Sequence, residues 1–301
     1  MKVLVTGGTT FVSRFTAEFF EKQGHDVFVL NRGTKKQSNG VHLIKADRHC
    51  LGNALLEHTF DAVIDVTAYT RKDVSDLLDG LGSFGKYILI SSSAVYPETL
   101  TQPFNEDQPC GPNIHWGAYG TNKIDAEQAL LQRVPDAYMI RPPYLYGPMN
   151  NLYREAYIFD CAEKNVPVYI PENEDMQLHF YHVRDLCMFI SELLDKTPTE
   201  HVFNVGNCET VSIREWVTKC YSVFCKTPEF VKVSSDIPAR TYFPFRDYEY
   251  VLNVSKQNTI LKPSITIEDG LKESYSWYKK HSEEVLKKDY FSVIAEKLNK
   301  K

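Results

Sequence analysis

The sequence predicts an α/β protein in which a doubly wound parallel sheet is followed by a smaller, loop-rich C-terminal domain. Short apolar runs alternate with amphipathic stretches over the first half of the chain. Parallel strands need helical crossovers of this kind. After about residue 147 the alternation gives way to longer segments rich in proline and aromatic residues. The 301 residues, 43% of them hydrophobic, are enough for a large domain and a smaller one.

Each expected element follows from its local pattern. Strands are expected at Lys2–Thr6, Asp26–Asn31, His42–Ala46, Ala62–Val66, Tyr87–Ser91 and Ala137–Ile140. Helices are expected at Phe11–Lys22, closed by Gly24, and at Leu51–His58, Val74–Leu81 and Ile124–Arg133. The apolar run Val202–Val205 is expected to return to the main sheet, so 178–206 would join the domain formed by 1–147, and 148–301 would form the second domain.

Charge and composition narrow the possible partners and compartment. The formal net charge is −5, which leaves no broad basic field, so we do not expect nucleic acid as a partner. Basic residues near the C-terminus alternate with glutamates and indicate a solvent-exposed helix surface: Lys279, Lys280, Lys287, Lys288, Lys297, Lys300 and Lys301. No apolar run is long enough to span a membrane, and no signal-peptide core precedes the first strand. A cytoplasmic location is therefore expected.

Cysteine and histidine patterns give no sign of a disulfide framework or a metal centre. Seven cysteines is an odd number, and none forms a Cys-x-x-Cys pair, so reduced thiols are expected. His179 and His182 lie three positions apart in a strand-like stretch without a third ligand nearby. We predict that they hold no metal.

The stretch from Thr6 to Ser13 follows a strand and opens a helix, which is the context of a dinucleotide-binding loop. Backbone N–H groups at a helix start can hold a pyrophosphate. The usual three-glycine spacing would fall on Gly7, Thr10 and Ser13, of which only the first is glycine. The Thr10 hydroxyl can still face a phosphate. The expected contacts of this loop are Gly7, Gly8, Thr10, Phe11 and Val12.

The ends of the next strands bear on the identity of the cofactor. A carboxylate after the second strand would favour NAD, but this chain has Asn31 and Arg32, and Arg32 could face a 2′-phosphate. We therefore expect NAD or NADP, with a slight preference for NADP. Asp47 and Arg48 end the third strand and are expected to flank the adenine. The other expected cofactor contacts are Ala68, Tyr69, Lys123 and Pro142.

A Tyr-x-x-x-Lys pair, Tyr119 and Lys123, is the candidate catalytic motif. Positions i and i+4 share a helix face, so the ammonium would lie beside the phenol and lower its pKa. Ser92 ends the fifth strand and could hold the substrate oxygen that Tyr119 deprotonates. A second pair, Tyr275 and Lys279, has no serine run before it and is interpreted as surface.

Taken together, these motifs resemble the extended short-chain dehydrogenase/reductase superfamily, in its nucleotide-sugar epimerase and dehydratase group. The resemblance also covers Arg141–Pro148, His182–Asp185 and Phe203–Gly206. It implies a Rossmann-type sheet and gives Ser92, Tyr119 and Lys123 the catalytic roles, with Pro142 beside the nicotinamide. The opening Gly-Gly-Thr-x-Phe-Val, together with Phe243–Asp247 and Asp269–Leu271, is most similar to the atypical branch that contains chloroplast stem-loop-binding proteins.

Three functional hypotheses follow. The first is an epimerase-type enzyme acting on a nucleotide sugar through a transient 4-keto intermediate, with an NADPH-dependent carbonyl reductase as its alternative. Ser93 and Ala94 stand where family dehydratases place Asp-Glu, which disfavours dehydration. Expected substrate contacts are Ser93, Tyr144, Asn151, Arg154 and Arg246. The second hypothesis is a non-catalytic dinucleotide- or RNA-binding protein, as in the stem-loop-binding branch. The third is an assembly role; a homodimer through Val74–Leu81 and the Tyr119–Arg133 helix is also compatible with an enzyme.

Overall fold

A computed structural model describes residues 1–298 and has the expected α/β architecture. Seven parallel strands form the main sheet in the order β11-β6-β5-β4-β1-β2-β3. This is the strand order of a doubly wound Rossmann-type sheet with one added strand. The strands are β1 (Lys2–Thr6), β2 (Asp26–Asn31), β3 (His42–Lys45), β4 (Phe60–Asp65), β5 (Phe84–Ile90), β6 (Tyr138–Arg141) and β11 (Val202–Asn204).

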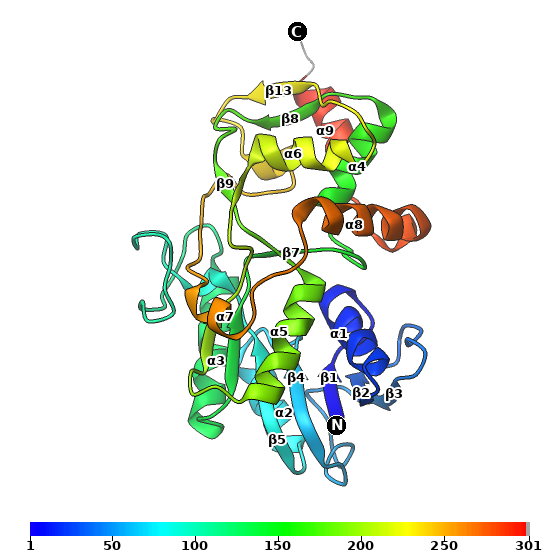
Figure 1. Ribbon diagram of the computed structural model, residues 1–301, viewed down its shortest axis with the longest axis vertical. Coiled ribbons are helices and arrows are strands. Elements are labelled where there is room, and N and C mark those ends of the chain that lie inside the picture. Colours follow the sequence, from blue (N-terminus) through cyan, green and yellow to red (C-terminus); the bar gives the residue numbers. More distant parts are fainter. Residues whose placement is uncertain (299–301) are drawn as a thin grey trace.

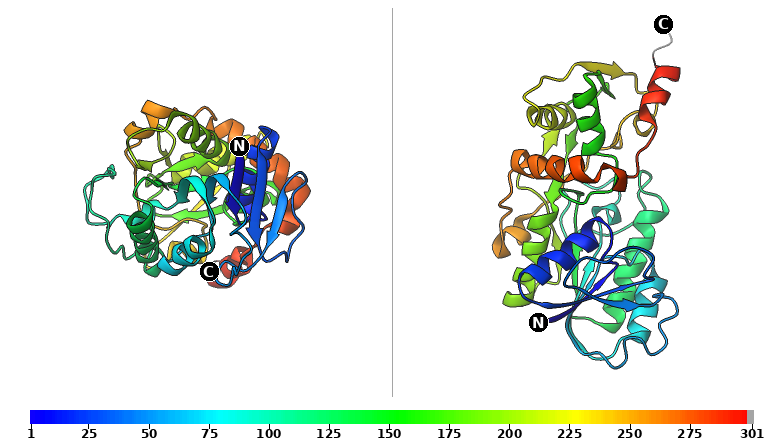
Figure 2. Two further views of the ribbon diagram at one scale, coloured as in Figure 1. Left: turned by 90° about the horizontal axis from the view of Figure 1, so that it is seen from below. Right: turned by 90° about the vertical axis from the view of Figure 1, so that its right-hand side faces the viewer.

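Two layers of helices cover the sheet. Helices α1 (Phe11–Lys22) and α5 (Val183–Lys196) bury apolar side chains against one face. Helices α2 (Arg71–Gly80) and α3 (Ala118–Arg133) pack on the other. Both views show these pairs on opposite sides of the sheet (Figure 2).

A second lobe lies beyond the carboxyl ends of the strands, at the opposite end from the N-terminus (Figure 1). Its helices are α4 (Glu155–Lys164), α6 (Ile213–Ser222), α8 (Ile267–His281) and α9 (Tyr290–Lys297), whereas α7 (Ser255–Ile260) packs beside α5 and β11 of the sheet domain. Short 3-10 turns occur at Ser93–Val95, Ala239–Thr241 and Ser282–Glu284. The remaining strands form three separate pairs: β7 (Tyr144–Tyr146) with β10 (Phe180–His182), β8 (Val168–Pro171) with β13 (Phe230–Val233), and β9 (Gln177–Leu178) with β12 (Val211–Ser212). The β8/β13 pair lies at the end of the lobe farthest from the main sheet (Figure 1).

An aromatic core holds the second lobe together. The Trp216 ring stacks on Phe180 with centroids 3.7 Å apart, and Tyr146 and Phe245 contact the pair edge-on. Tyr181, the next residue after Phe180, belongs instead to the core under the main sheet, because side chains alternate along the strand. The domain boundary at 147/148 stays a prediction; β11 does pair with β6 in the main sheet, as expected for Val202–Val205.

One predicted helix is wrong. The segment Leu51–His58 forms consecutive turns with i→i+3 hydrogen bonds, such as Ala54 N–H to the Leu51 carbonyl at 3.0 Å. Gly52 has φ +52°, a left-handed conformation that an α-helix cannot contain. Leu51 and Leu55 are still buried, so the apolar spacing that suggested a helix serves a string of turns.

The ends of α2 and α3 also differ from expectation. Helix α2 begins at Arg71, three residues early, because Thr70 and Asp73 form a reciprocal capping box. Helix α3 begins at Ala118, after Gly117 at φ +53°, so Tyr119 lies in its first turn. At the end of α1, Gly24 has φ +82°, as expected for a residue that closes a helix.

The cysteines form no disulfide in the described range 1–298. All seven lie within that range and are free thiols there. Within that range, no helix is both long and apolar enough to cross a membrane. Lys279 and Lys280 lie in the last turn of α8, and Lys287 forms an ion pair with Asp160, whereas Lys300 and Lys301 lie outside the described residues.

Candidate functional site

A cleft of about 410 Å³ opens at the carboxyl ends of β1, β4 and β5. Such ends are where open α/β sheets bind ligands. The cleft brings together residues that are far apart in sequence and that were predicted as cofactor, catalytic or substrate contacts: Thr10, Phe11, Val12, Tyr69, Ser92, Tyr119, Lys123, Pro142, Asn151 and Arg154. A second cavity of about 350 Å³ continues past Thr67, which lines both, toward Asn31, Arg32, Asp47 and Arg48.

The loop after β1 is built to accept an anion. Gly7 and Gly8 have φ +91° and +86°, and a Cβ on Gly7 would lie 2.8 Å from Ser13 Oγ. Thr10 is the N-cap of α1, yet its side chain makes no capping hydrogen bond and the first turn has no acidic residue. The helix start, with its positive dipole end, is therefore left open to a ligand. These features fit the pyrophosphate of a dinucleotide.

Ser92 and Tyr119 face each other in the cleft. Ser92 lies two residues after β5, as the N-cap of a 3-10 turn, and accepts a hydrogen bond from the Ala94 N–H, which orients its hydroxyl. Burial raises the pKa of Tyr119, and a hydrogen bond with Ser92 opposes this only in part. Tyr119 is still 39% exposed and lines the cleft that a substrate would enter.

Lys123 does not sit as the spacing predicted. Its ammonium donates to the backbone carbonyls of Ala68 (2.7 Å) and Ile90 (2.8 Å) and lies 4.9 Å from the centre of the Tyr69 ring. The pKa of Tyr119 is raised by burial, and the groups that oppose this shift are Ser92 and Arg154, so the expected effect of Lys123 on Tyr119 stays a prediction. The i+4 spacing places Lys123 on the same helix face as Tyr119. The position of its ammonium, however, depends on the carbonyl acceptors that the segments after β4 and at the end of β5 provide. One of the three ammonium N–H donors remains for a ligand.

The second cavity, which was predicted to hold the adenosine end of a cofactor, differs from the predicted pattern in its hydrogen bonding. The Asn31 amide donates to the Gly7 carbonyl at 2.6 Å and to Gln37, and it accepts from Gly33 N–H and from Gln37. This uses the full donor capacity of the amide. Asn31 therefore holds the phosphate loop in place and does not offer a free side-chain donor to a ribose. Arg32 is exposed and makes no ion pair among residues 1–298.

Asp47 and Arg48 line the same cavity but have different surroundings. Asp47 is exposed and accepts a hydrogen bond from His49 N–H. Arg48 is held inward by an ion pair with Asp65 at 2.8 Å. Arg48 therefore contributes a fixed wall to the cavity, whereas Asp47 lies at its surface.

The predicted substrate residues divide into two groups. Asn151 and Arg154 line the cleft, and the Arg154 guanidinium lies 4.7 Å from the Tyr144 ring centre. Ser93, Tyr144 and the cofactor candidate Ala68 are buried and do not line it. Tyr144 packs in the aromatic core of the second lobe, because its strand β7 is covered by that lobe.

Ser93 and Arg246 both lie outside the cleft and contact neighbouring residues. The Ser93 N–H donates to the Pro142 carbonyl at 3.0 Å, which positions the segment beside the cleft. Arg246 lies 4.8 Å from the centre of the Trp116 ring and lines neither cavity. Its expected contact with substrate stays a prediction.

Sequence reasoning missed several lining residues. Ser91, Pro143, Leu145 and Leu152 contribute to the cleft. Thr67 follows β4 and joins the two cavities. Its position two residues after a strand end was the available signal. The remaining residues come from loops whose path depends on packing between the lobes.

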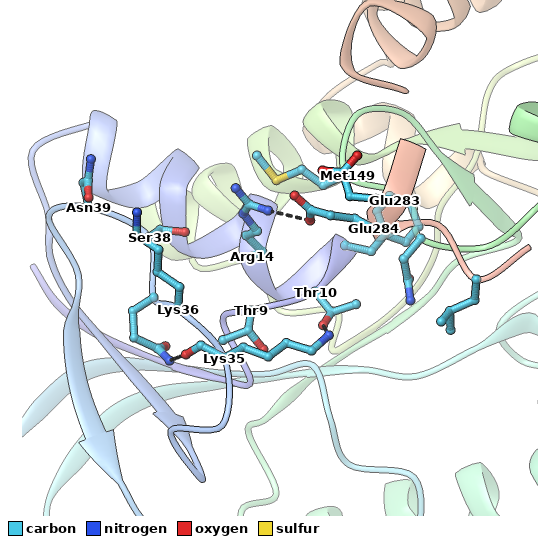
Figure 3. Close-up of a pocket in the computed structure, with 14 residues that line it drawn as sticks. Thr9, Thr10, Arg14, Lys35, Lys36, Ser38, Asn39, Met149, Glu283 and Glu284 are labelled. Atoms are coloured by element: carbon cyan, nitrogen blue, oxygen red, sulfur yellow. Dashed lines mark hydrogen bonds and ion pairs between the residues drawn. The ribbon is translucent and has the colours of Figure 1, made fainter. Parts of the chain in front are cut away.

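A third cavity, of about 560 Å³, lies behind the phosphate loop and shares Thr10, Phe11 and Asn151 with the cleft. Figure 3 shows Lys35 reaching toward Thr10, with the Lys35 Nζ to Thr10 Oγ1 distance at 3.4 Å, and Arg14 paired with Glu284 across it at 3.0 Å. The ion pair connects α1 to the C-terminal segment. The phosphate loop is therefore flanked by basic side chains that the sequence motif alone did not identify.

His179 and His182 are both fully enclosed. His179 Nδ1 accepts from Leu252 N–H at 3.1 Å and Nε2 lies 2.8 Å from the Asn207 carbonyl. His182 Nδ1 accepts from Arg184 N–H at 3.3 Å at the start of α5. Both rings are thus held within the protein framework.

Comparison with known proteins places this geometry in a family. Residues 3–206 match the NAD dependent epimerase/dehydratase family. The chain is 28% identical to chloroplast stem-loop binding protein of 41 kDa b from Arabidopsis thaliana, over 91% of this chain and 78% of that protein. It is 28% identical to dTDP-4-dehydrorhamnose reductase from Streptomyces griseus, over 48% of this chain and 50% of that enzyme.

Among solved structures, the fold is similar to UDP-glucuronic acid 4-epimerase from Bacillus cereus in complex with UDP-glucuronic acid and NAD. The TM-score is 0.73 at 18% identity, with 93% of this chain and 99% of that chain covered. The family match spans both the phosphate loop and the Ser92, Tyr119 and Lys123 cleft. The chain therefore belongs to the NAD dependent epimerase/dehydratase family.

Proposed function

We propose that the protein is a nicotinamide-dinucleotide-dependent enzyme that epimerises a nucleotide sugar through a transient keto intermediate. The observation that carries this proposal is the single cleft that joins an open phosphate loop to Ser92, Tyr119 and Lys123. The family match and the similarity to a solved UDP-glucuronic acid 4-epimerase support it.

The chain's own residues account for binding and proton handling. The α1 start and Thr10 would hold the pyrophosphate, and the remaining Lys123 N–H would be available to a ribose hydroxyl. A bound nicotinamide would supply hydride transfer to and from the sugar. Ser92 holds the sugar oxygen by a hydrogen bond, and Tyr119 removes its proton and later returns it. Arg154 at the cleft wall attracts the diphosphate of the sugar nucleotide.

A keto-sugar reductase that uses NADPH is the second candidate. Two observations favour it: burial raises the pKa of Tyr119, which keeps the phenol protonated and ready to donate to a carbonyl oxygen, and Arg32 is exposed beside the adenosine cavity. The relationship to a dTDP-4-dehydrorhamnose reductase agrees with this alternative.

The test is to denature the purified protein and identify the released nicotinamide by mass and absorbance. Retained oxidised NAD would support epimerisation, because an epimerase regenerates its cofactor within each turnover. Empty protein that binds NADPH reversibly would support the reductase. Binding of neither form, together with salt-dependent RNA binding, would overturn both and favour the non-catalytic activity suggested by the stem-loop-binding relative.

We further propose a homodimer formed through α2 and α3. These helices lie side by side on one face of the sheet (Figure 1). Leu131 of α3 is 38% exposed there. The mass in solution tests this proposal, and a monomer at micromolar concentration would refute it.

A further inference from the structure

The loop between β2 and β3 is tied by side chains to the phosphate loop. Asn31, the last residue of β2, donates from its amide to the Gly7 carbonyl at 2.6 Å and to Gln37 Oε1 at 2.9 Å. Gln37 Nε2 in turn donates to the Lys35 carbonyl at 2.6 Å. Two amide side chains therefore connect the backbone of Lys35 to the turn that follows β1.

The Lys35 side chain ends at the open start of α1. Its Nζ lies 3.4 Å from Oγ1 of Thr10, the N-cap residue of that helix (Figure 3). Thr10 makes no capping hydrogen bond, so its hydroxyl proton is free to donate to a ligand while its oxygen faces the ammonium. Thr10 stands where the dinucleotide fingerprint has its second glycine, and it lines both the cleft and the cavity behind the phosphate loop. The Lys35 ammonium thus lies where the two cavities meet.

No carboxylate in the described part of the chain pairs with the Lys35 ammonium. Three basic residues line the cavity behind the phosphate loop: Arg14, Lys35 and Lys36. Arg14 pairs with Glu18 and Glu284, each at 3.0 Å, whereas neither lysine forms an ion pair within residues 1–298. A cation near a helix N-terminus faces the positive end of the helix dipole, so this placement does not stabilise the fold by itself. An anion bound at the start of α1 would compensate for both.

We propose that Lys35 binds the pyrophosphate of the dinucleotide together with the start of α1, and that Gln37 is a positioning residue that holds Lys35 at the phosphate loop. This role of Lys35 rests on the proposed function, because it adds a contact to the same dinucleotide. Lysine binds phosphate as a point charge, and its flexible stem can follow a phosphate that the helix start holds. The β2–β3 loop thereby supplies a charge that the fingerprint around Gly7 lacks.

Lys35→Met and Lys36→Met form a matched pair of variants. Both lysines are exposed and both substitutions remove one positive charge, but the Lys36 side chain has no hydrogen bond or ion pair among residues 1–298, whereas Lys35 contacts Thr10. Calorimetric titration with NAD, NADP and ADP-ribose, after charcoal treatment to remove any bound nucleotide, measures the effect. ADP-ribose carries the pyrophosphate without the nicotinamide.

Lys35→Met should bind all three ligands about tenfold more weakly than wild type, because one charge-assisted contact with the pyrophosphate is lost. Lys36→Met should stay within about twofold of wild type, since an exposed charge without a direct contact is screened by salt. Thermal unfolding without ligand should be the same for both variants and wild type, because neither lysine is buried.

Gln37→Ala tests the positioning of Lys35 without changing its charge. The variant loses the hydrogen bond to the Lys35 carbonyl and the hydrogen bonds with Asn31. It should weaken binding of the three ligands about threefold in the wild-type background and have no further effect in Lys35→Met, because the two residues act as one unit. A role of Gln37 in the structure alone would give the same loss in both backgrounds.

Each outcome bears on one part of the proposal. Wild-type affinity in Lys35→Met, or an equal loss in Lys36→Met, would overturn the contact with the pyrophosphate. A loss confined to NADP would also overturn it, because the lysine would then contact the 2′-phosphate. Additive losses in the Gln37→Ala, Lys35→Met double variant would overturn the positioning role. If the wild-type protein binds ADP-ribose but neither NAD nor NADP, the proposed function fails while the ADP-ribose titration still decides the role of Lys35; binding of none of the three overturns both.

Discussion

Replacing His179 should remove part of the acid sensitivity of the fold. Its Nδ1 accepts the Leu252 N–H, so the ring proton must sit on Nε2, which donates to the Asn207 carbonyl. A second proton would have to enter at Nδ1, against an N–H that already points there. Burial accordingly lowers the pKa of His179 from 6.5 to about 4, with the Asn207 hydrogen bond as a smaller opposing influence.

The sign follows from proton binding in the two states. Between pH 6.5 and 4 the unfolded chain binds a proton at this histidine and the folded chain does not, so stability falls as the pH falls. One pKa unit corresponds to about 1.36 kcal/mol, so the difference between 6.5 and about 4 is worth about 3 kcal/mol. Full stability is present above pH 6.5 and is lost toward pH 4.

Urea unfolding of wild type and His179→Gln at several pH values between 7 and 4 measures this effect. The glutamine amide keeps one donor and one acceptor and has no titratable proton. Wild type should lose about 3 kcal/mol more than the variant over this range, while the contributions of His182 and Asp65 cancel in the difference. His42→Gln, at an exposed ring, is the control. Equal losses in wild type and His179→Gln would refute the reasoning.

Three further predictions concern the cleft. Gly8→Ala should destabilise the protein by about 3 kcal/mol, because Gly8 has a positive φ and the added Cβ would lie 2.5 Å from the Val29 side chain in β2. Gly24→Ala also has a positive φ but open space around it, and should cost about 1 kcal/mol. Thermal and urea unfolding compare the two variants, and equal losses of stability would contradict the packing argument. Tyr119→Phe should lower turnover of a nucleotide sugar by about a hundredfold or more, while Tyr275→Phe in the second Tyr-x-x-x-Lys pair should leave it unchanged. Arg32→Ala should weaken NADP binding about tenfold and NAD binding much less in calorimetric titration, and a uniform loss would remove its assignment to the 2′-phosphate.

Most of the sheet could be predicted from sequence because its strands are short and apolar and most of them are separated by helices. The right-handedness of parallel crossovers restricts the possible strand orders, but the order itself comes from the structure. The predicted helix at Leu51–His58 was wrong for a local reason. Hydrophobic periodicity indicates which side chains face the core, but it carries no information on the left-handed backbone at Gly52.

The site was predictable to the extent that its residues end strands or begin helices. Thr10, Ser92 and Tyr119 meet in one cleft for this reason. The position of Lys123, with its ammonium on the carbonyls of Ala68 and Ile90, was not predictable, because a long side chain ends where the surrounding loops provide acceptors.

The sequence by itself determined the doubly wound sheet, the phosphate loop and the presence of a tyrosine, a lysine and a serine at the ends of its elements, because these depend on local periodicity and spacing. Only the tertiary structure decided which charges lie beneath them. In the sequence, Asp65 is one of several residues near the end of an expected strand. Its ion pair with Arg48, which lies in the loop after β3, forms only when the parallel strands assemble into the sheet. Burial then makes that pairing strong, since charges removed from water are weakly screened.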